Sequence, residues 1–321
     1  MTCRGEFAGT LVSSRLKPAA AIIYLRRVKL APVLVALAIV TLLGGCDWAV
    51  TPARPAGGGP RIVSLTPSVT ETLFALGAGR EVVGVSQYCD YPPSVAQLPR
   101  VGSFITPNVE AIAALRPTLV VGLASASALR EIRALGAMGL ATLMVDDGSV
   151  PAIEDSIVRV GDRIGRGARA RELVRALRDQ VGAVQVRLRD QPQRSVLMVV
   201  GHQPMVAVGR GTCLDDLLTL AGAANIAAAA NQAWPRLSVE YIIASRPEVI
   251  LDGQMGTDPS TPDTFWSKYP TIPAVHNHRV VGYPDDPTLH PGPRIGMTLE
   301  ELARLIHPAA FSAVGTPERA P

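Results

Sequence analysis

Two stretches of the chain repeat the same helix-to-strand pattern. Residues 108–121 (NVEAIAALRPTLVV) align without a gap with residues 238–251 (SVEYIIASRPEVIL), and six of the fourteen positions are identical. Each copy begins with a residue that favours a helix N-cap, carries Glu in the first turn, where the helix dipole stabilises an anion, and ends in an apolar run. A chance match in an Ala-rich chain is the alternative. We expect two similar α/β lobes that hold Glu110 and Glu240 at equivalent places.

Short apolar runs alternate with helical segments on both sides of this repeat. Strands are expected at residues 61–65, 82–85, 119–122, 141–145, 195–200, 249–251 and 279–281. Helices are expected at residues 69–76, 111–115, 129–138, 214–220, 239–245 and 293–306. This alternation is typical of βαβ units with mostly parallel sheets, so the sequence predicts an α/β fold with Rossmann-like lobes.

The middle of the chain, residues 152–190, has helical spacing and no strand signal. Gly165 and Gly167 interrupt it once, and the piece from 168 to 189 would be about 33 Å long at 1.5 Å per residue. We expect a single long helix that connects the lobes; a surface helix of one large domain is the alternative. The expected divisions are a signal peptide at 1–45, a tether at 46–60, lobes at 61–166 and 191–310, a connecting helix at 167–190 and a tail at 311–321.

The N-terminal segment has the layout of a secretory signal. An uncharged apolar run at 30–45 follows basic residues at positions 26, 27 and 29. The run is shorter than the ~20 residues of a membrane-spanning helix, although a transmembrane anchor is the alternative. It ends in Leu-Gly-Gly-Cys46, which resembles a bacterial lipobox and implies acylation of Cys46. Asp47 resembles the signal that retains lipoproteins at the inner membrane, and the Pro- and Gly-rich residues 51–60 indicate a flexible tether.

The basic charge of the chain belongs to its N-terminus. Residues 1–45 hold six of the 31 basic residues and one of the 27 acidic ones, so the rest of the chain has a net charge of −1. A nearly neutral body argues against nucleic-acid binding. With Cys3 removed and Cys46 acylated, Cys89 and Cys213 remain; we favour two unpaired buried thiols, and a disulfide is the alternative.

A set of local motifs resembles the helical-backbone class of periplasmic binding proteins, and within it the cobalamin-binding members. The motifs are residues 61–67 (RIVSLTP), 84–93 (GVSQYCDYPP), 108–110 (NVE) with 116–117 (RP), 234–240 (WPRLSVE) and 293–294 (PR). The resemblance covers residues 61–307. It implies two lobes joined by one long helix, a ligand cleft between them, and delivery of cobalamin, haem or a ferric siderophore to an ABC importer.

The resemblance also implies roles for individual residues. The ligand-contacting positions are Pro67, Tyr88, Phe104 (where relatives carry Trp), Trp234, Asp286 and His290 (where relatives can carry Arg). Aromatic walls with a few polar groups suit a large flat macrocycle. Glu110 and Glu240 would pair with arginines of the permease dimer, because two separated carboxylates fix the register of docking. Plain capping of their helices is the alternative.

Three histidines need separate interpretation. His202 follows a predicted strand, so it would face the cleft and approach the metal of a bound macrocycle as an axial ligand. A hydrogen-bonded loop histidine is the favoured alternative. His276 and His278 flank one residue in an expected turn, and no third ligand is near enough in sequence to complete a metal site.

The motifs of common enzymes are missing from the sequence. It has no Gly-x-Ser-x-Gly elbow, no phosphate-binding Gly-x-x-x-x-Gly-Lys-Ser/Thr loop and no His-Glu-x-x-His. Together with the resemblance and the lipobox, this leads us to expect a monomeric carrier without an enzymatic cofactor, anchored by lipid at the periplasmic face of the inner membrane. A haem or ferric-siderophore carrier is the nearest alternative, and a tethered sensor or scavenging lipoprotein without a transporter is the alternative from another class.

Overall fold

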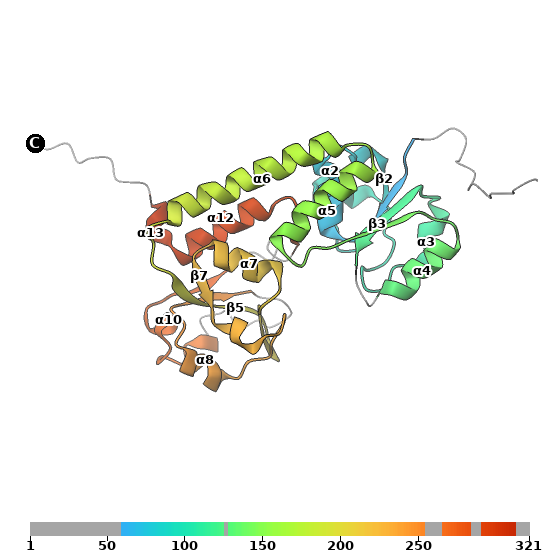
Figure 1. The fold of residues 1–321 in the computed structure, drawn as a ribbon. Helices are drawn as coiled ribbons and strands as arrows, with labels where there is room; N and C mark the ends of the chain where they lie inside the picture. Colours follow the sequence, from blue (N-terminus) through green and yellow to red (C-terminus); the bar gives the residue numbers. More distant parts are fainter. Residues whose placement is uncertain (1–58, 125–127, 254–264, 284–289, 313–321) are drawn as a thin grey trace, which may run out of the picture. The chain divides into compact units, whose positions relative to one another are not determined.

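The computed structural model describes four parts of the chain, residues 59–124, 128–253, 265–283 and 290–312. The expected signal peptide, most of the tether, Cys46 and Asp286 lie outside the described residues. Within the described parts the structure is α/β, with two separate sheets and helices between their strands (Figure 1). No described helix is long and apolar enough to cross a membrane.

The first sheet contains four parallel strands in the order β2-β1-β3-β4. The strands are β1 (Ile62–Ser64), β2 (Val82–Val85), β3 (Leu119–Leu123) and β4 (Thr142–Val145). Their helices are α2 (Pro67–Ala75), α3 (Val109–Ala114) and α4 (Leu129–Ala137). The two central strands, β1 and β3, are almost fully buried, as expected where helices cover both faces of a parallel sheet.

The second sheet is built around β5 (Arg194–His202). Its neighbours are β7 (Ala223–Asn225) and β6 (Met205–Ala207) along one edge, then β8 (Val249–Asp252) and β9 (Val280–Gly282) on the other side. Only β6 is antiparallel. The parallel strands thus follow the order β7-β5-β8-β9, which repeats that of the first sheet. Helices α7 (Cys213–Leu220), α8 (Val239–Ser245) and α10 (Pro273–His276) belong to this part.

The repeat in the sequence is also a repeat in the structure. Its first copy forms α3 and β3, and its second copy forms α8 and β8, each strand lying between two parallel neighbours. Asn108 and Ser238 cap the two helices by accepting from backbone N–H groups at 2.8 Å and 3.2 Å. Both copies turn towards the strand through an arginine in the left-handed region, Arg116 (φ 47°) and Arg246 (φ 49°). The prediction of two similar α/β lobes is confirmed.

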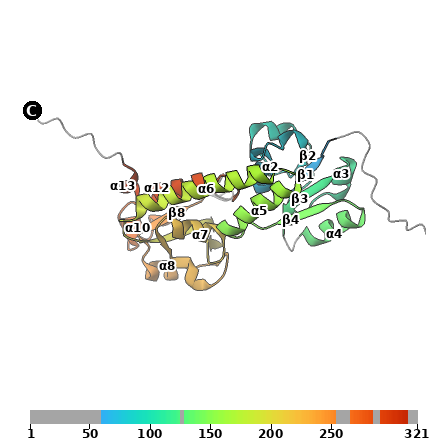
Figure 2. The same ribbon diagram turned by 45° about the horizontal axis from the view of Figure 1, so that its top comes forward.

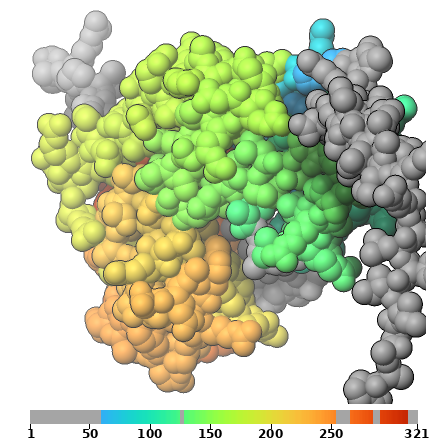
Figure 3. Space-filling view, turned by 45° about the vertical axis from the view of Figure 1, so that its right-hand side comes forward, coloured from blue at the N-terminus to red at the C-terminus, as the bar shows by residue number. Residues whose placement is uncertain are grey.

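Helix α6 (Gly167–Leu188) follows α5 (Val150–Arg163) and leads into β5, close to the predicted bounds of 168–189. It packs against α5 and against α12 (Ile295–Ile306), as both ribbon views show (Figures 1 and 2). The residues of α5 and α6 form one unbroken yellow-green surface in the space-filling view (Figure 3). A single cluster of buried apolar residues runs from β1 and α2 through α5 and α6 to β5, α7 and α12.

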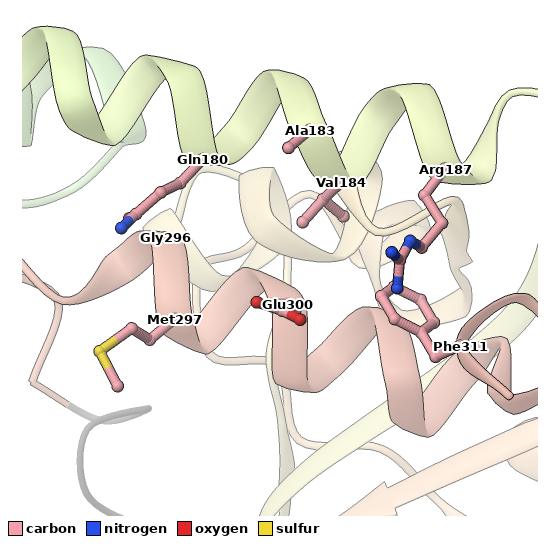
Figure 4. A pocket seen from close by; sticks show the side chains of 8 residues that line it. All are labelled: Gln180, Ala183, Val184, Arg187, Gly296, Met297, Glu300 and Phe311. Carbon is pink, nitrogen blue, oxygen red and sulfur yellow. The ribbon is translucent and has the colours of Figure 1, made fainter. Parts of the chain in front are cut away.

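The far end of α6 is joined to α12 and to α13 (Pro308–Phe311) by stacked cations. The guanidinium carbons of Arg187 and Arg304 lie 4.9 Å and 4.8 Å from the centre of the Phe311 ring. Figure 4 shows Arg187 reaching from α6 to that ring, beside a recess in which Gln180 of α6 lies over Gly296 of α12. These contacts hold the C-terminal helices against α6.

The expected elements are present, with differences that have local causes. Helix α2 begins at Pro67 rather than at 69, because proline suits the first position of a helix. Helix α12 begins at Ile295, two residues later than expected. The three-residue strands β6 and β7 were not predicted, because they have no strand pattern of their own. They are strands because they pair with β5. Three 3-10 helices were also not predicted, at Gly79–Glu81, Pro93–Gln97 and Ile226–Ala230.

The close approach of α5 and α6 predicts that a glycine-to-alanine substitution changes stability in opposite directions at two positions. A Cβ atom on Gly161 would lie 2.4 Å from the Cβ atom of buried Ala170, whereas a Cβ atom on Gly182 would meet nothing within 4 Å. We expect Gly161→Ala to lower the free energy of unfolding by about 1–3 kcal/mol, and Gly182→Ala to raise it by up to about 1 kcal/mol. Urea denaturation measures both, and a Gly161→Ala variant as stable as the parent would contradict the packing described here.

Candidate functional site

The carboxyl ends of β1, β3 and β4 open onto a hollow of about 230 Å³. The lining residues are Leu65, Thr66, Phe104, Leu123, Ala124, Ala128, Ile132 and Asp147. Strand β1 has β2 on one side and β3 on the other, so the order of the strands reverses at this point although all four strands are parallel. Ligands of open parallel sheets bind at such switch points, outside the carboxyl ends of the strands. The first lobe therefore offers a concave site at the expected edge.

Two of the predicted ligand residues stand together at this edge. The ring centres of Tyr88 and Phe104 are 5.6 Å apart, and the side chains are 46% and 39% exposed. The loops that carry them are joined by a hydrogen bond from the Gln87 N–H to the Gly102 carbonyl, 2.9 Å long. Gly102 has φ 90°, and a Cβ atom there would lie 2.8 Å from the Asn108 nitrogen, so only glycine fits this turn. The loops hold an aromatic pair in the open, outside the core.

The other predicted ligand residues are placed separately. Pro67 is buried as the first residue of α2, directly after Thr66, which lines the hollow. Trp234 is half exposed on a loop of the second lobe and makes no ring contact with another described residue. Backbone hydrogen bonds on both sides of Trp234 fasten this loop to the β6 region. His290 is half-buried, at the start of the segment that leads into α12.

An ion pair joins that segment to the first lobe. Arg294, the N-cap of α12, donates two hydrogen bonds to the carboxylate of Glu71 in α2, at 2.7 Å and 2.5 Å. The Glu71 side chain is only 2% exposed. The ring of Tyr91 covers the same guanidinium at 4.2 Å. Sequence analysis placed Tyr91 and Arg294 in motifs but gave them no role; the structure shows that they form one cluster with Glu71.

His202, at the end of β5, belongs to a second cluster. Its Nε2 lies 2.8 Å from Oδ1 of Asp252, the last residue of β8, and Trp266 donates to the same carboxylate at 2.6 Å. Phe265 lies against the imidazole, with ring centres 4.5 Å apart. The Nδ1 atom is shielded from solvent and has no hydrogen-bond partner in the described parts of the chain. This matches the alternative of a hydrogen-bonded histidine, and the axial-ligand role stays a prediction.

Asp147 is a site residue that sequence reasoning missed. It lies one residue beyond Asp146, which follows β4 directly, and it lines the hollow and borders a smaller cavity beside α2 and α5. Burial and the neighbouring carboxylate of Asp146 raise the pKa of Asp147 to about 6. Two consecutive aspartates at the predicted end of an apolar strand were the available signal, because the carboxyl ends of parallel strands form the ligand edge.

The two glutamates of the repeat are exposed in the first turns of α3 and α8. Neither makes an ion pair with another described residue. Hydrogen bonds from its own backbone and from Ser238 lower the pKa of Glu240, so this carboxylate is charged at neutral pH. Both carboxylates are therefore open to an external cation.

Both body cysteines are free and buried. Burial raises the pKa of Cys213 to about 12, with further contributions from the carboxylates of Asp216 and Asp147. Burial also raises the pKa of Cys89. Both are therefore unreactive thiols at neutral pH, in agreement with the favoured prediction. The described residues include no group of three or more His, Cys, Asp or Glu side chains that would hold a metal ion.

Comparisons with known proteins agree with this architecture. The family described as "Periplasmic binding protein" matches residues 62–287. The vitamin B12-binding protein of Salmonella paratyphi A is 29% identical over 216 residues, 67% of this chain and 80% of that protein. The apo structure of the periplasmic heme-binding protein RhuT from Roseiflexus sp. RS-1 is 31% identical with a TM-score of 0.71, covering 79% of this chain and all of its own. The periplasmic vitamin B12 binding protein BtuF of Vibrio cholerae shares the fold, with 24% identity, a TM-score of 0.69, and coverage of 78% of this chain and 98% of its own.

The buried ion pair between Glu71 and Arg294 predicts an asymmetric response to substitution. Arg294→Met removes the cation beside a nearly inaccessible carboxylate, so we expect a loss of about 3–5 kcal/mol in the free energy of unfolding. The double variant Glu71→Leu with Arg294→Met should regain a large part of that loss, because the buried carboxylate is then removed together with its guanidinium partner. Denaturant titration of both variants checks this. A double variant that is less stable than Arg294→Met alone would refute the interpretation.

Proposed function

Because the chain belongs to the periplasmic binding protein family, a class of solute-binding proteins, we propose that it captures cobalamin or a related corrinoid and delivers it to an ABC importer. The observation that carries this proposal is the exposed Tyr88–Phe104 pair above the hollow of the first lobe. Exposed aromatic side chains held in place by loop hydrogen bonds suit a large flat macrocycle. Relatives named vitamin B12-binding proteins support the choice of ligand.

In the proposed complex the macrocycle lies between the lobes. Tyr88, Phe104 and Pro67 contact it from the first lobe, and Trp234 and His202 from the second. His290 and Asp286 contact its rim. The described part of the hollow contains no basic side chain, whereas a site for an anionic siderophore needs several. A haem carrier is the second candidate, favoured by the 31% identity to a heme-binding protein.

The proposed location is the periplasmic face of the inner membrane. Residues 1–45 act as the signal peptide, acylated Cys46 anchors the chain in the bilayer, and residues 46–60 are the tether. The protein works as a monomer without an enzymatic cofactor and carries out no chemistry on its ligand. The lobes span 61–166 and 191–310, with residues 167–190 between them and 311–321 as the tail.

The proposed contacts with the permease dimer are Glu110 and Glu240. They occupy equivalent first turns in the two copies of the repeat, and both are exposed and without an ion pair among the described residues. Their helices are already capped by Asn108 and Ser238. The Glu240 carboxylate accepts local hydrogen bonds from its own backbone and from Ser238, yet it is exposed like that of Glu110, and two separated anions can bind two cationic sockets in one register.

Binding to a panel of ligands tests the carrier role. We expect the purified protein to bind cyanocobalamin and cobinamide more tightly than haemin in calorimetric titrations. Replacing both Tyr88 and Phe104 by Ala should weaken corrinoid binding about 10- to 30-fold, because the pair forms an aromatic wall of the site. Val186→Ala on α6, at an apolar residue that is more exposed than either aromatic, is the control and should have no effect. Tight binding of haemin alone would favour the second candidate.

Charge reversal tests the delivery step. We expect Glu110→Lys with Glu240→Lys to abolish most corrinoid uptake by cells while corrinoid affinity stays within about twofold, because the carboxylates contact the permease and not the ligand. Glu172→Lys on the exposed face of α6 is the matched control. Unchanged uptake by the double variant would instead favour a tethered sensor or scavenging lipoprotein that works without an importer.

A further inference from the structure

The two lobes share a strand order but differ at the carboxyl ends of their strands. In the second lobe, Asp252 at the end of β8 is bonded to His202 and to fully buried Trp266, and Tyr283 donates to the Val199 carbonyl at 2.9 Å. In the first lobe, the corresponding ends of β1 and β3 border the hollow. A group that projects from a bound macrocycle thus finds room in the first lobe.

Among the described residues, the walls of this hollow are apolar apart from two side chains. Leu65, Leu123 and Ile132 contribute apolar surface, whereas Thr66 and Asp147 are polar. No described side chain donates a hydrogen bond to the Asp147 carboxyl or forms an ion pair with it. The Asp147 carboxylate is a partly desolvated acceptor without a side-chain donor, so an N–H group of a bound ligand would stabilise it.

We propose that the hollow is a subsite for a primary amide arm of the macrocycle, and that Asp147 selects amide-bearing corrinoids against carboxylate-bearing haem. The inference rests on the proposed function. Corrinoids carry acetamide and propionamide groups around the ring, and each amide offers N–H donors to a carboxylate. Haem carries propionates, which a carboxylate in a partly desolvated hollow repels.

The charged groups around Asp147 strengthen this selection. Asp146 lies beside it in the same turn, and the thiol of Cys213 on α7 interacts electrostatically with both Asp147 and Asp216. Asp216 accepts a hydrogen bond from the Val150 N–H at 3.0 Å, which fixes its carboxylate near the start of α5. None of these groups is a cation. The side-chain charges next to Asp147 are therefore negative, and they disfavour an anionic ligand group relative to a neutral amide donor.

The same geometry gives the two ligand classes opposite pH dependences. With a pKa of about 6, Asp147 changes from mostly neutral at pH 5 to mostly ionised at pH 7.5. An amide donor binds the ionised form more tightly, so corrinoid affinity should rise across this range. A propionate is repelled by the ionised form, so haemin affinity should fall across it.

Titrations of the full-length protein with cobinamide and haemin at pH 5.0, 6.0 and 7.5 test the inference. Asp147→Asn keeps an acceptor and removes the charge, so cobinamide affinity should stay within about threefold while haemin affinity at pH 7.5 rises about tenfold. Asp147→Leu should weaken cobinamide binding about tenfold or more, because it removes the acceptor. Both variants should lose the opposite pH dependences, and Asp155→Asn on the exposed surface of α5 is the matched control.

A further variant tests the neighbouring charge. Asp146→Asn should move the midpoint of the cobinamide pH profile to lower pH, because the Asp146 carboxylate raises the pKa of Asp147. If the parent binds cobinamide but Asp147→Asn keeps the parent's pH profile and ligand preference, the subsite is refuted and the carrier function stands. If the parent binds neither macrocycle, the proposed function itself fails. Asp147→Asn is nearly isosteric and gives this answer even where Asp147→Leu does not fold.

Discussion

Helix α6 packs closely against both α5 and α12, and this packing links the first sheet to the second. Gly161 lets α5 approach Ala170 of α6, and Gly296 lets α12 lie under Gln180. Through these contacts one apolar cluster extends from the first sheet to the second. The lobes are therefore joined by a hydrophobic core and not only by a stretch of chain. A long helix packed on two sides resists bending, which suits a carrier whose ligand edges keep a nearly fixed geometry.

The Glu71–Arg294 pair extends this connection towards the ligand edge. Arg294 belongs to the start of α12, and Glu71 to α2, whose first residue lies beside the hollow. Tyr91, three residues after Tyr88, covers the guanidinium. The loop that presents the aromatic pair and the segment that begins at His290 are thus fastened to the same cation. A buried bidentate pair fixes orientation more strictly than apolar contacts do, so it suits a place where two parts of a binding site must keep their spacing.

Regular patterns in the sequence predicted the elements that depend on them. The apolar runs predicted the strands from β1 to β9, except β6 and β7. The repeat at 108–121 and 238–251 predicted that the two lobes are equivalent. Strands β6 and β7 exist because β5 offers them an edge, and no local pattern records that. The same holds for the ion pair, whose partners are 223 residues apart. The raised pKa of Asp147 depends on burial by several elements and is likewise not encoded in a local pattern.

Two lobes with the same strand order need not bind a ligand in the same way. The second lobe uses its strand ends to satisfy a buried carboxylate: Asp252 accepts hydrogen bonds from an imidazole and an indole, so its charge is already compensated by donors. The first lobe leaves Asp147 at the equivalent edge without such donors. Both carboxylates lie where parallel strands end, but Asp252 ends the central strand β8 and Asp147 lies beyond the outer strand β4, so their neighbours differ. The Asp252 carboxylate has its hydrogen-bond donors within the protein and so stabilises its lobe. The Asp147 carboxylate lacks such donors and is stabilised by a ligand that supplies them. The first lobe is therefore the better place for the ligand selection proposed above.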